Sequence, residues 1–258
     1  MCRMLAYDGD LNSKEYQEIL ASFAILGENG CVPCGIEKGH LDGWGIHSSD
    51  TKDSIYFRSI NSVDKKNLLN KANQLNNDYG QTVVHLRKAT VGKNAICNTH
   101  PFMRAGISFS HNGSIHAFPN STFISDRHFR EGHTDSETFF MRIIDRINGQ
   151  IGDSSLDNIK NALLEEIEEI KNISEWTSLT CLIKSPNGII INYLWNEKHP
   201  DVEKLKLNEY YTFYIGKKEN ITVTSSEILN IDGFIWEKLN NNTVLVLPFK
   251  IDNELSRS

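Results

Sequence analysis

The chain has 258 residues, of which 39% are hydrophobic and 23% are charged, so it can build a packed core and is not a disordered chain. A net charge of −6 without a sustained basic run argues against a nucleic-acid-binding protein. No apolar run approaches the ~18 residues that a membrane span needs.

The N-terminal ten residues contain one arginine, a short apolar stretch and then acids, which is not the pattern of a secretory signal peptide. We therefore expect the protein in the reducing cytoplasm, where its five cysteines would be thiols rather than a disulfide framework. Because no linker, repeat or low-complexity tract interrupts the pattern, we expect a single domain over residues 2–250. We assign it neither a cofactor nor a metal.

Cys2 has an unusual position. If Met1 is removed, Cys2 carries a thiol and a free α-amine on one residue. An α-amine titrates at about 7.7–8.0, far below a lysine, so it can accept the thiol proton at neutral pH. Nucleophile and base would then share one residue. On position alone, the alternative is a small residue that merely follows the start methionine.

The first half of the chain alternates predicted strands and helices. Residues 2–7 read as a buried strand that carries Cys2 into the core. Asn12 or Ser13 can cap a helix that runs to Leu26 and stops at Gly27. The further elements of this half are strands over 55–60, 82–86 and 107–111 and a helix over 64–76.

Cys31 and Cys34 form a C-x-x-C pair, which can be a redox pair or half of a zinc site. The chain has no second such pair and no thioredoxin-like context. We favour two loop thiols, with incidental metal binding alongside His40 as the alternative.

The second half begins with Thr134-Asp-Ser-Glu137, which predicts a capping box at the start of an amphipathic helix. A second helix is predicted over 156–172. Five strands follow, over 178–184, 189–195, 210–216, 221–225 and 243–247. Two sheets covered by helices would bury the apolar faces of all these elements.

Several short motifs are weak when taken singly. Asn112-Gly113 is a common hairpin dipeptide, so a tight turn would explain it. Arg87 is compatible with a surface ion pair, and His100 with an ordinary loop histidine. Thr134 to Glu137 is explained by helix capping.

Taken together and in order, these motifs resemble the class II glutamine amidotransferase domain, a branch of the N-terminal nucleophile (Ntn) hydrolases. The resemblance rests on Met1-Cys2, Asp42-Gly-Trp-Gly-Ile46, His85-Leu-Arg-Lys-Ala-Thr90 with Gly92, Asn98-Thr-His-Pro-Phe102, His111-Asn-Gly113 and Thr134-Asp-Ser-Glu137. The Ser225-Ser-Glu227 segment with Trp236 resembles the end of the same domain. The family implies a four-layer α/β/β/α sandwich of two stacked, mainly antiparallel sheets, and removal of Met1.

The resemblance also implies a mechanism. The thiolate of Cys2 would attack the side-chain amide of glutamine to give a tetrahedral oxyanion. The side-chain N–H of Asn112 and the backbone N–H of Gly113 would form the oxyanion hole. The α-amine would protonate the leaving ammonia, and water would hydrolyse the γ-glutamyl thioester.

Substrate-binding residues follow from the same motifs. Arg87 would hold the α-carboxylate of glutamine, since a guanidinium matches a carboxylate bidentately. Asp135 would hold the α-ammonium group. Thr90 and His100 match positions that line the glutamine pocket. Lys88 departs from the family, which often has an aromatic residue after the substrate arginine.

The leading hypothesis is therefore an enzyme that hydrolyses glutamine or transfers its amide nitrogen, acting either alone as a hydrolase or with a separate synthase subunit that accepts the ammonia. One alternative is a hydrolase of another γ-glutamyl amide, as in ergothioneine synthesis. The other is a non-catalytic regulatory subunit that keeps the fold. The last is disfavoured because the nucleophile, the oxyanion donors and both substrate-binding charges are all present.

Overall fold

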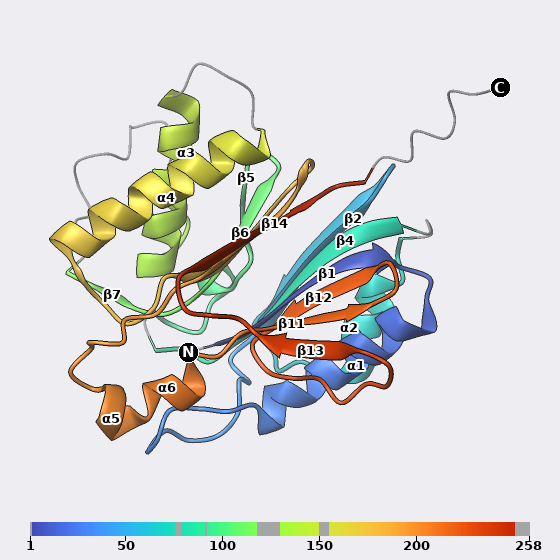
Figure 1. The fold of residues 1–258 in the computed structure, drawn as a ribbon, viewed down its shortest axis with the longest axis horizontal. Helices are drawn as coiled ribbons and strands as arrows, with labels where there is room; N and C mark the ends of the chain where they lie inside the picture. The colour runs from blue at the N-terminus through green and yellow to red at the C-terminus, as the bar shows by residue number, and fades with distance from the viewer. Residues whose placement is uncertain (1, 76–78, 91, 118–129, 150–154, 251–258) are drawn as a thin grey trace.

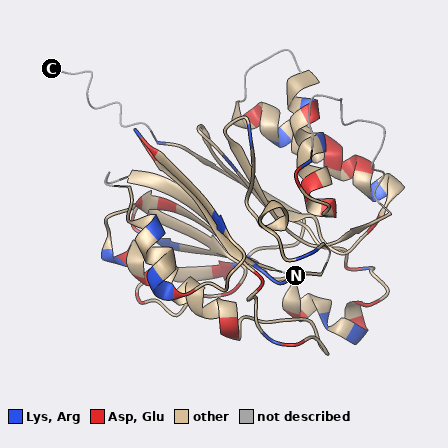
Figure 2. Ribbon diagram, turned by 180° about the vertical axis from the view of Figure 1, so that it is seen from behind, with Lys and Arg blue, Asp and Glu red and all other residues tan. Residues whose placement is uncertain are grey.

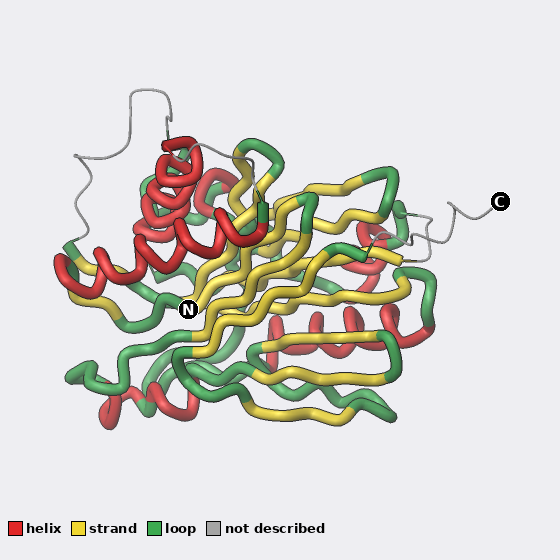
Figure 3. The backbone as a smooth tube through the Cα atoms, turned by 45° about the horizontal axis from the view of Figure 1, so that its top comes forward, coloured by secondary structure: helices red, strands yellow, loops and turns green. Residues whose placement is uncertain are grey.

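Two stacked β-sheets form the centre of the molecule, and helices cover the outer face of each (Figure 1). The computed structural model describes residues 2–75, 79–90, 92–117, 130–149 and 155–250. The tube view shows the four layers, with the strands stacked between the helices (Figure 3). The predicted α/β/β/α Ntn-hydrolase sandwich of mainly antiparallel sheets is confirmed.

The larger sheet has seven strands in the order β13-β11-β12-β1-β4-β2-β3. Every pairing within it is antiparallel. Its strands are β1 (Cys2–Asp10), β2 (Trp44–Asp50), β3 (Ser54–Ser59), β4 (Tyr79–Arg87), β11 (Tyr214–Lys218), β12 (Ile221–Ser225) and β13 (Ile235–Lys238).

The second sheet has five antiparallel strands in the order β14-β10-β9-β6-β5. Its strands are β5 (Phe102–Arg104), β6 (Ile107–Asn112), β9 (Thr180–Ser185), β10 (Gly188–Tyr193) and β14 (Thr243–Pro248). Two short strands, β7 (Ile115–His116) and β8 (Glu175–Trp176), pair separately.

The helices are α1 (Lys14–Asn29), α2 (Lys65–Ala72), α3 (Asp135–Gly149), α4 (Leu156–Ile173), α5 (Val202–Leu205) and α6 (Leu207–Tyr210), with a 3-10 turn over Ile96–Asn98. Helices α1 and α2 cover the seven-stranded sheet, and α3 and α4 cover the five-stranded sheet. Charged residues gather on these outer helices, whereas most of the strand ribbon is uncharged (Figure 2). None of the helices in the described ranges combines the length and apolarity needed to cross a bilayer.

Three apolar layers hold the sandwich together, one under each helix pair and one between the sheets. The alternation of side chains along β1 explains how one strand serves two layers. Leu5 and Tyr7 pack against the helices, whereas Met4 and Ala6 face the other sheet. Since both faces of β1 are covered, Cys2 is carried into a buried position at its start.

Most predicted elements are present, with shifted ends. Ser13 caps α1 through its hydroxyl, which accepts from the N–H of Tyr16. The predicted stop at Gly27 is wrong, because α1 continues to Asn29. Gly27 lies against Val63, whose Cγ1 would stand 2.6 Å from an added Cβ, so close packing explains this glycine.

Two further predictions are corrected. The helix expected over 64–76 begins after its cap Asp64 but already ends at Ala72. The strand expected over 210–216 starts only at Tyr214, because α6 occupies the segment up to Tyr210. Strand β13 escaped prediction because it is an exposed edge strand without a clear apolar alternation.

Candidate active site

Cys2 begins β1 and lies directly opposite Arg87, the last residue of β4. Its side chain is 6% exposed. The antiparallel register therefore brings the predicted nucleophile and the predicted carboxylate-binding cation to the same end of the sheet. Arg87 is also buried, so the alternative of an ordinary surface ion pair is wrong.

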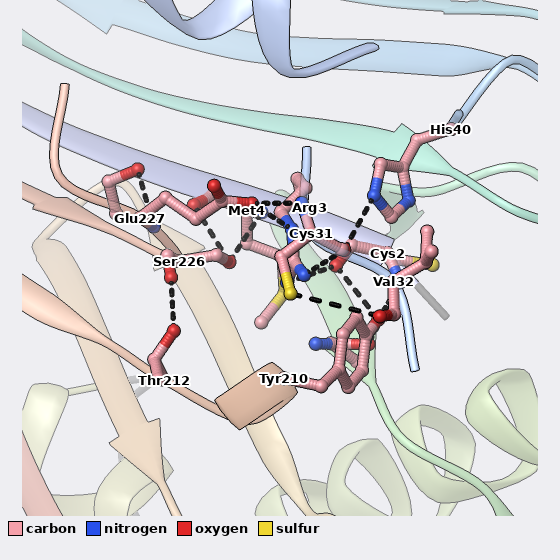
Figure 4. Close-up of polar contacts among 12 residues, drawn as sticks. Cys2, Arg3, Met4, Cys31, Val32, His40, Tyr210, Thr212, Ser226 and Glu227 are labelled. Carbon is pink, nitrogen blue, oxygen red and sulfur yellow. Dashed lines mark hydrogen bonds and ion pairs between the residues drawn. The ribbon is translucent and has the colours of Figure 1, made fainter. Parts of the chain in front are cut away.

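The backbone nitrogen of Cys2 is held by two buried acceptors, of which Tyr210 is labelled beside Cys2 in Figure 4. It donates to the Asn112 Oδ1 at 2.9 Å and to the Tyr210 hydroxyl at 2.7 Å. The Tyr210 hydroxyl lies 3.0 Å from the same Asn112 oxygen and 3.2 Å from the Cys2 carbonyl, to one of which it donates its own proton. Residues from β1, β6 and α6 thus fix the position of this nitrogen.

The surroundings of Cys2 favour a thiolate. Burial by itself raises the pKa of the Cys2 thiol, but the positive charge of the amino terminus, which here is the amine of Met1, and then His85 outweigh it and lower the pKa to about 5. A thiol with this pKa is ionised at neutral pH, which is the form that acts as a nucleophile.

His85 and His100 form a buried pair beside Cys2, with ring centroids 4.3 Å apart and ring planes tilted by 38°. His85 makes a side-chain hydrogen bond with Cys2 that helps to lower the pKa of the thiol, whereas within the described residues neither nitrogen of the His100 ring has a hydrogen-bond partner. Burial, followed by the charge of His85, holds the pKa of His100 well below its usual range. His85 stands in a recognised motif but was not among the predicted site residues, although its place two residues before Arg87 on β4 puts both on the same face.

A narrow cavity of about 30 Å³ opens beside Cys2. All the predicted site residues except Asn112 line it, and Asn112 adjoins it through its contact with Cys2. The lining residues are Cys2, Arg87, Lys88, Thr90, Asn98, His100, His111, Gly113, Thr134, Asp135 and Ser136.

Asp135 lies at the first turn of α3, where a carboxylate is favoured by the helix dipole. Its Oδ2 accepts from the backbone N–H of Ile115 at 2.7 Å. Thr134 caps the helix by accepting from the N–H of Glu137, as the predicted capping box requires. The carboxylate of Glu137 instead accepts from the N–H groups of Glu131 and Gly132, so the predicted box is only half formed.

Asn112 and Gly113 do not form a hairpin turn, so that alternative is wrong. Strand β6 ends at Asn112, and the next strand, β7, pairs with β8 instead of returning along β6. A glycine is needed at position 113 because the backbone of Ser178 passes very close to it. A Cβ added to Gly113 would stand 1.9 Å from the Ser178 carbonyl oxygen.

The C-x-x-C cysteines lie outside the cavity. Cys31 and Cys34 are free, exposed thiols in the loop after α1. His40 reaches the carbonyl oxygen of Cys31 at 3.2 Å rather than either thiol. In the described parts of the chain, no cluster of His, Cys, Asp and Glu side chains could hold a metal ion.

Residues 1–182 match the family model described as class-II glutamine amidotransferases. A protein of Haemophilus influenzae described as "Putative glutamine amidotransferase" is 31% identical over 146 residues, which are 54% of this chain and 46% of that protein. YafJ of Escherichia coli, with the same description, is 29% identical over 160 residues, 57% of this chain and 55% of its own length. The chain spans about half the length of the curated relatives that it matches.

Solved structures share the fold at low sequence identity. A glutamine aminotransferase class-II domain protein from Silicibacter pomeroyi has a TM-score of 0.53 and 16% identity, covering 95% of this chain and 94% of that one. The glutamine phosphoribosylpyrophosphate amidotransferase of Bacillus subtilis has a TM-score of 0.58 and 12% identity, covering 98% of this chain and 50% of that one.

Proposed function

Because the chain belongs to the class II glutamine amidotransferases, we propose that it is an enzyme that hydrolyses the side-chain amide of glutamine to glutamate and ammonia. The observation that carries the proposal is the environment of Cys2. A buried thiol with its pKa lowered to about 5 adjoins a backbone nitrogen that Asn112 and Tyr210 hold in place.

The reaction begins after Met1 has been removed, so that the Cys2 nitrogen becomes a primary amine. With the thiol ionised and this amine protonated, the thiolate sulfur attacks the amide carbon of glutamine. As the tetrahedral intermediate collapses, the ammonium group of Cys2 gives its proton to the leaving nitrogen, and ammonia departs. A water molecule then attacks the thioester, which releases glutamate and restores the thiol.

The orientation of Asn112 suits it to the oxyanion hole. Its Oδ1 is engaged by the Cys2 nitrogen and the Tyr210 hydroxyl, so its Nδ2 is the donor left for the substrate. The backbone N–H of Gly113 would be the second donor, at a position where the Ser178 carbonyl leaves room only for glycine. Two donors aimed at developing negative charge stabilise the transition state more than the ground state.

Replacing Asn112 by alanine is expected to lower kcat by about 100-fold or more while changing KM much less. The substitution removes a donor that meets charge only in the transition state, together with one acceptor for the Cys2 nitrogen. Steady-state kinetics with glutamine measure this split. A loss confined to KM would instead indicate a residue that only contacts the bound substrate.

The Tyr210→Phe variant isolates the contact with the amine. Its lost hydroxyl accepts from the Cys2 nitrogen at 2.7 Å, and a hydrogen bond to a charged group contributes about 1.5–3 kcal/mol. Burial keeps the pKa of Tyr210 well above 10, so the hydroxyl is neutral and favours the protonated amine.

For Tyr210→Phe we therefore expect kcat to fall about 10-fold or more and the amine limb of the pH–rate profile to move to lower pH. The measurement is the pH dependence of kcat in protein whose Met1 has been removed. An unchanged profile would make Tyr210 a packing residue only.

The direct test of the function uses the purified chain. Intact mass first establishes whether Met1 is absent, since a retained Met1 blocks the amine. Glutamate and ammonia are then assayed separately, and equal molar release from glutamine is expected. Other γ-glutamyl amides in the same assay test the alternative substrate class. If no compound of either class is hydrolysed, the regulatory-subunit alternative replaces this proposal.

Three further proposals accompany the activity. All five cysteines are free, which fits the reducing cytoplasm as the compartment. The three apolar layers run through the two shared sheets, which fits a single glutamine amidotransferase domain over residues 2–250. The ammonia would be consumed by a separate synthase subunit.

A further inference from the structure

A second, larger cavity lies at the end of the sandwich opposite Cys2. Its volume is about 480 Å³, within the range of small-molecule pockets, whereas the cavity beside Cys2 has about 30 Å³. Its lining includes residues at the end of β2, at the end of β9 and directly after β14. Strand β9 connects the two cavities. Its residue Thr180 pairs with Asn112 beside Cys2, and its residue Lys184, four positions further on, lines the larger cavity. The two cavities are therefore about 13 Å apart along this strand.

Lys184 forms the floor of this cavity and is completely buried. Its Nζ donates to the hydroxyl of Ser49 at 2.5 Å. Within the residues that the structure describes, no carboxylate forms an ion pair with Lys184, and burial is the cause that shifts its pKa, to about 8. Lys184 is therefore still mainly a cation at neutral pH.

The side chain beside Lys184 does not neutralise it. Burial, followed by the charge of Lys184, lowers the pKa of His47 to about 3, so His47 is uncharged. The Nδ1 of His47 is bonded to the hydroxyl of Ser108 at 2.7 Å. A buried cation without a counter-charge destabilises a fold by several kcal/mol, so its retention in a cavity calls for a ligand that supplies the charge.

The rest of the cavity restricts what that ligand can be. Met103, Pro186 and Phe249 give it an apolar wall. The buried Asp50 and the exposed Lys52 and Asp53 also line the cavity, and the Oδ1 of Asp50 accepts from the N–H of Asp53. The exposed rim thus carries one charge of each sign, so the selection comes from the interior, where an anion with an apolar body suits both Lys184 and the apolar wall.

We propose that this cavity binds a small organic monocarboxylate, with its carboxylate on Lys184 and Ser49 and its apolar part against Met103 and Phe249. The site is separate from the Cys2 cavity, so it does not depend on the proposed glutaminase activity.

The test compares three probes by ligand-observed NMR titration of the wild-type chain: phenylacetate, its neutral isostere phenylacetamide, and inorganic phosphate. Phenylacetate is expected to bind saturably, and the other two at least about tenfold more weakly, because only phenylacetate supplies both one negative charge and an apolar body. Equal binding of the amide, preference for phosphate, or no saturable binding of phenylacetate would overturn the proposal.

Lys184→Met removes the charge with little change in volume. Phenylacetate binding should weaken at least about tenfold, while the melting temperature without ligand stays the same or rises, since a buried unpaired charge has been removed. If Lys184→Met fails to fold, Lys184→Gln replaces it in the same binding measurement. Glutamine also removes the charge but keeps a polar partner for Ser49, and the same loss of phenylacetate binding is expected.

Lys52→Met and Arg87→Met are the matched controls. Lys52 is an exposed lysine on the rim of the same cavity, and Arg87 is the buried cation of the other cavity. Both variants should bind phenylacetate as the wild type does. If Lys184→Met binds as tightly as the wild type, or if Arg87→Met alone loses binding, the proposal is wrong.

Discussion

Cys2→Ala is expected to abolish glutamine hydrolysis and to leave the fold intact. The substitution deletes one buried sulfur but keeps the backbone nitrogen and its bonds to Asn112 and Tyr210. Because no other group in the proposed mechanism can form the thioester, we expect the rate to fall by about 10⁴-fold or more. Activity is measured by release of glutamate, and folding by the melting temperature. Appreciable residual turnover would contradict the assignment of the nucleophile.

Chemical labelling identifies the nucleophile independently of turnover. With a thiol pKa of about 5, Cys2 should react with iodoacetamide from pH 5 upward, because the thiolate is already populated there. Cys31 is the matched control, since partial desolvation of this largely exposed thiol raises its pKa and delays its reaction to higher pH. A glutamine-analogue electrophile should modify Cys2 alone. If this electrophile modified Cys31 or Cys34 instead, the nucleophile would lie in the loop after α1 and the assignment of Cys2 would be wrong.

The sequence predicts helix starts better than helix ends in this chain. The caps of α1 and α2 depend on local bonds, in which Ser13 and Asp64 accept from an N–H three residues later. The end of α1 was misplaced because Gly27 is explained by its contact with Val63, which is distant in sequence. Local chemistry is visible in a sequence, whereas the space that a neighbouring element leaves is not.

The same distinction applies to the two cavities. Cys2, Arg87 and Asp135 stand in motifs that could be recognised, and they line one cavity. Tyr210 was missed because it meets Cys2 across 208 positions, in a segment predicted as a strand. Lys184 was missed because a lysine at a strand end normally reaches solvent, and only the stacking of the seven-stranded sheet against its own sheet buries it.

Removing either substrate-binding charge should reduce kcat/KM by one to several orders of magnitude. Arg87→Met leaves the α-carboxylate of glutamine without its buried partner, and a desolvated charge left unpaired costs about 2–5 kcal/mol. Asp135→Asn removes the charge that would meet the α-ammonium but keeps an oxygen to accept from the N–H of Ile115. That choice separates substrate binding from the support that Asp135 gives to the loop.

Both variants should lose the same factor with glutamine and with any γ-glutamyl amide, because neither charge touches the group on the amide nitrogen. The control is the wild-type enzyme with glutamine whose α-amine is acylated. Acylation removes the positive charge that Asp135 would bind, so this compound should be hydrolysed very slowly. If it reacts as fast as glutamine, the pocket does not recognise the glutamyl group, and the chain is a general amidase. If Asp135→Asn is fully active while Arg87→Met is not, Asp135 only anchors Ile115 and another acceptor binds the ammonium.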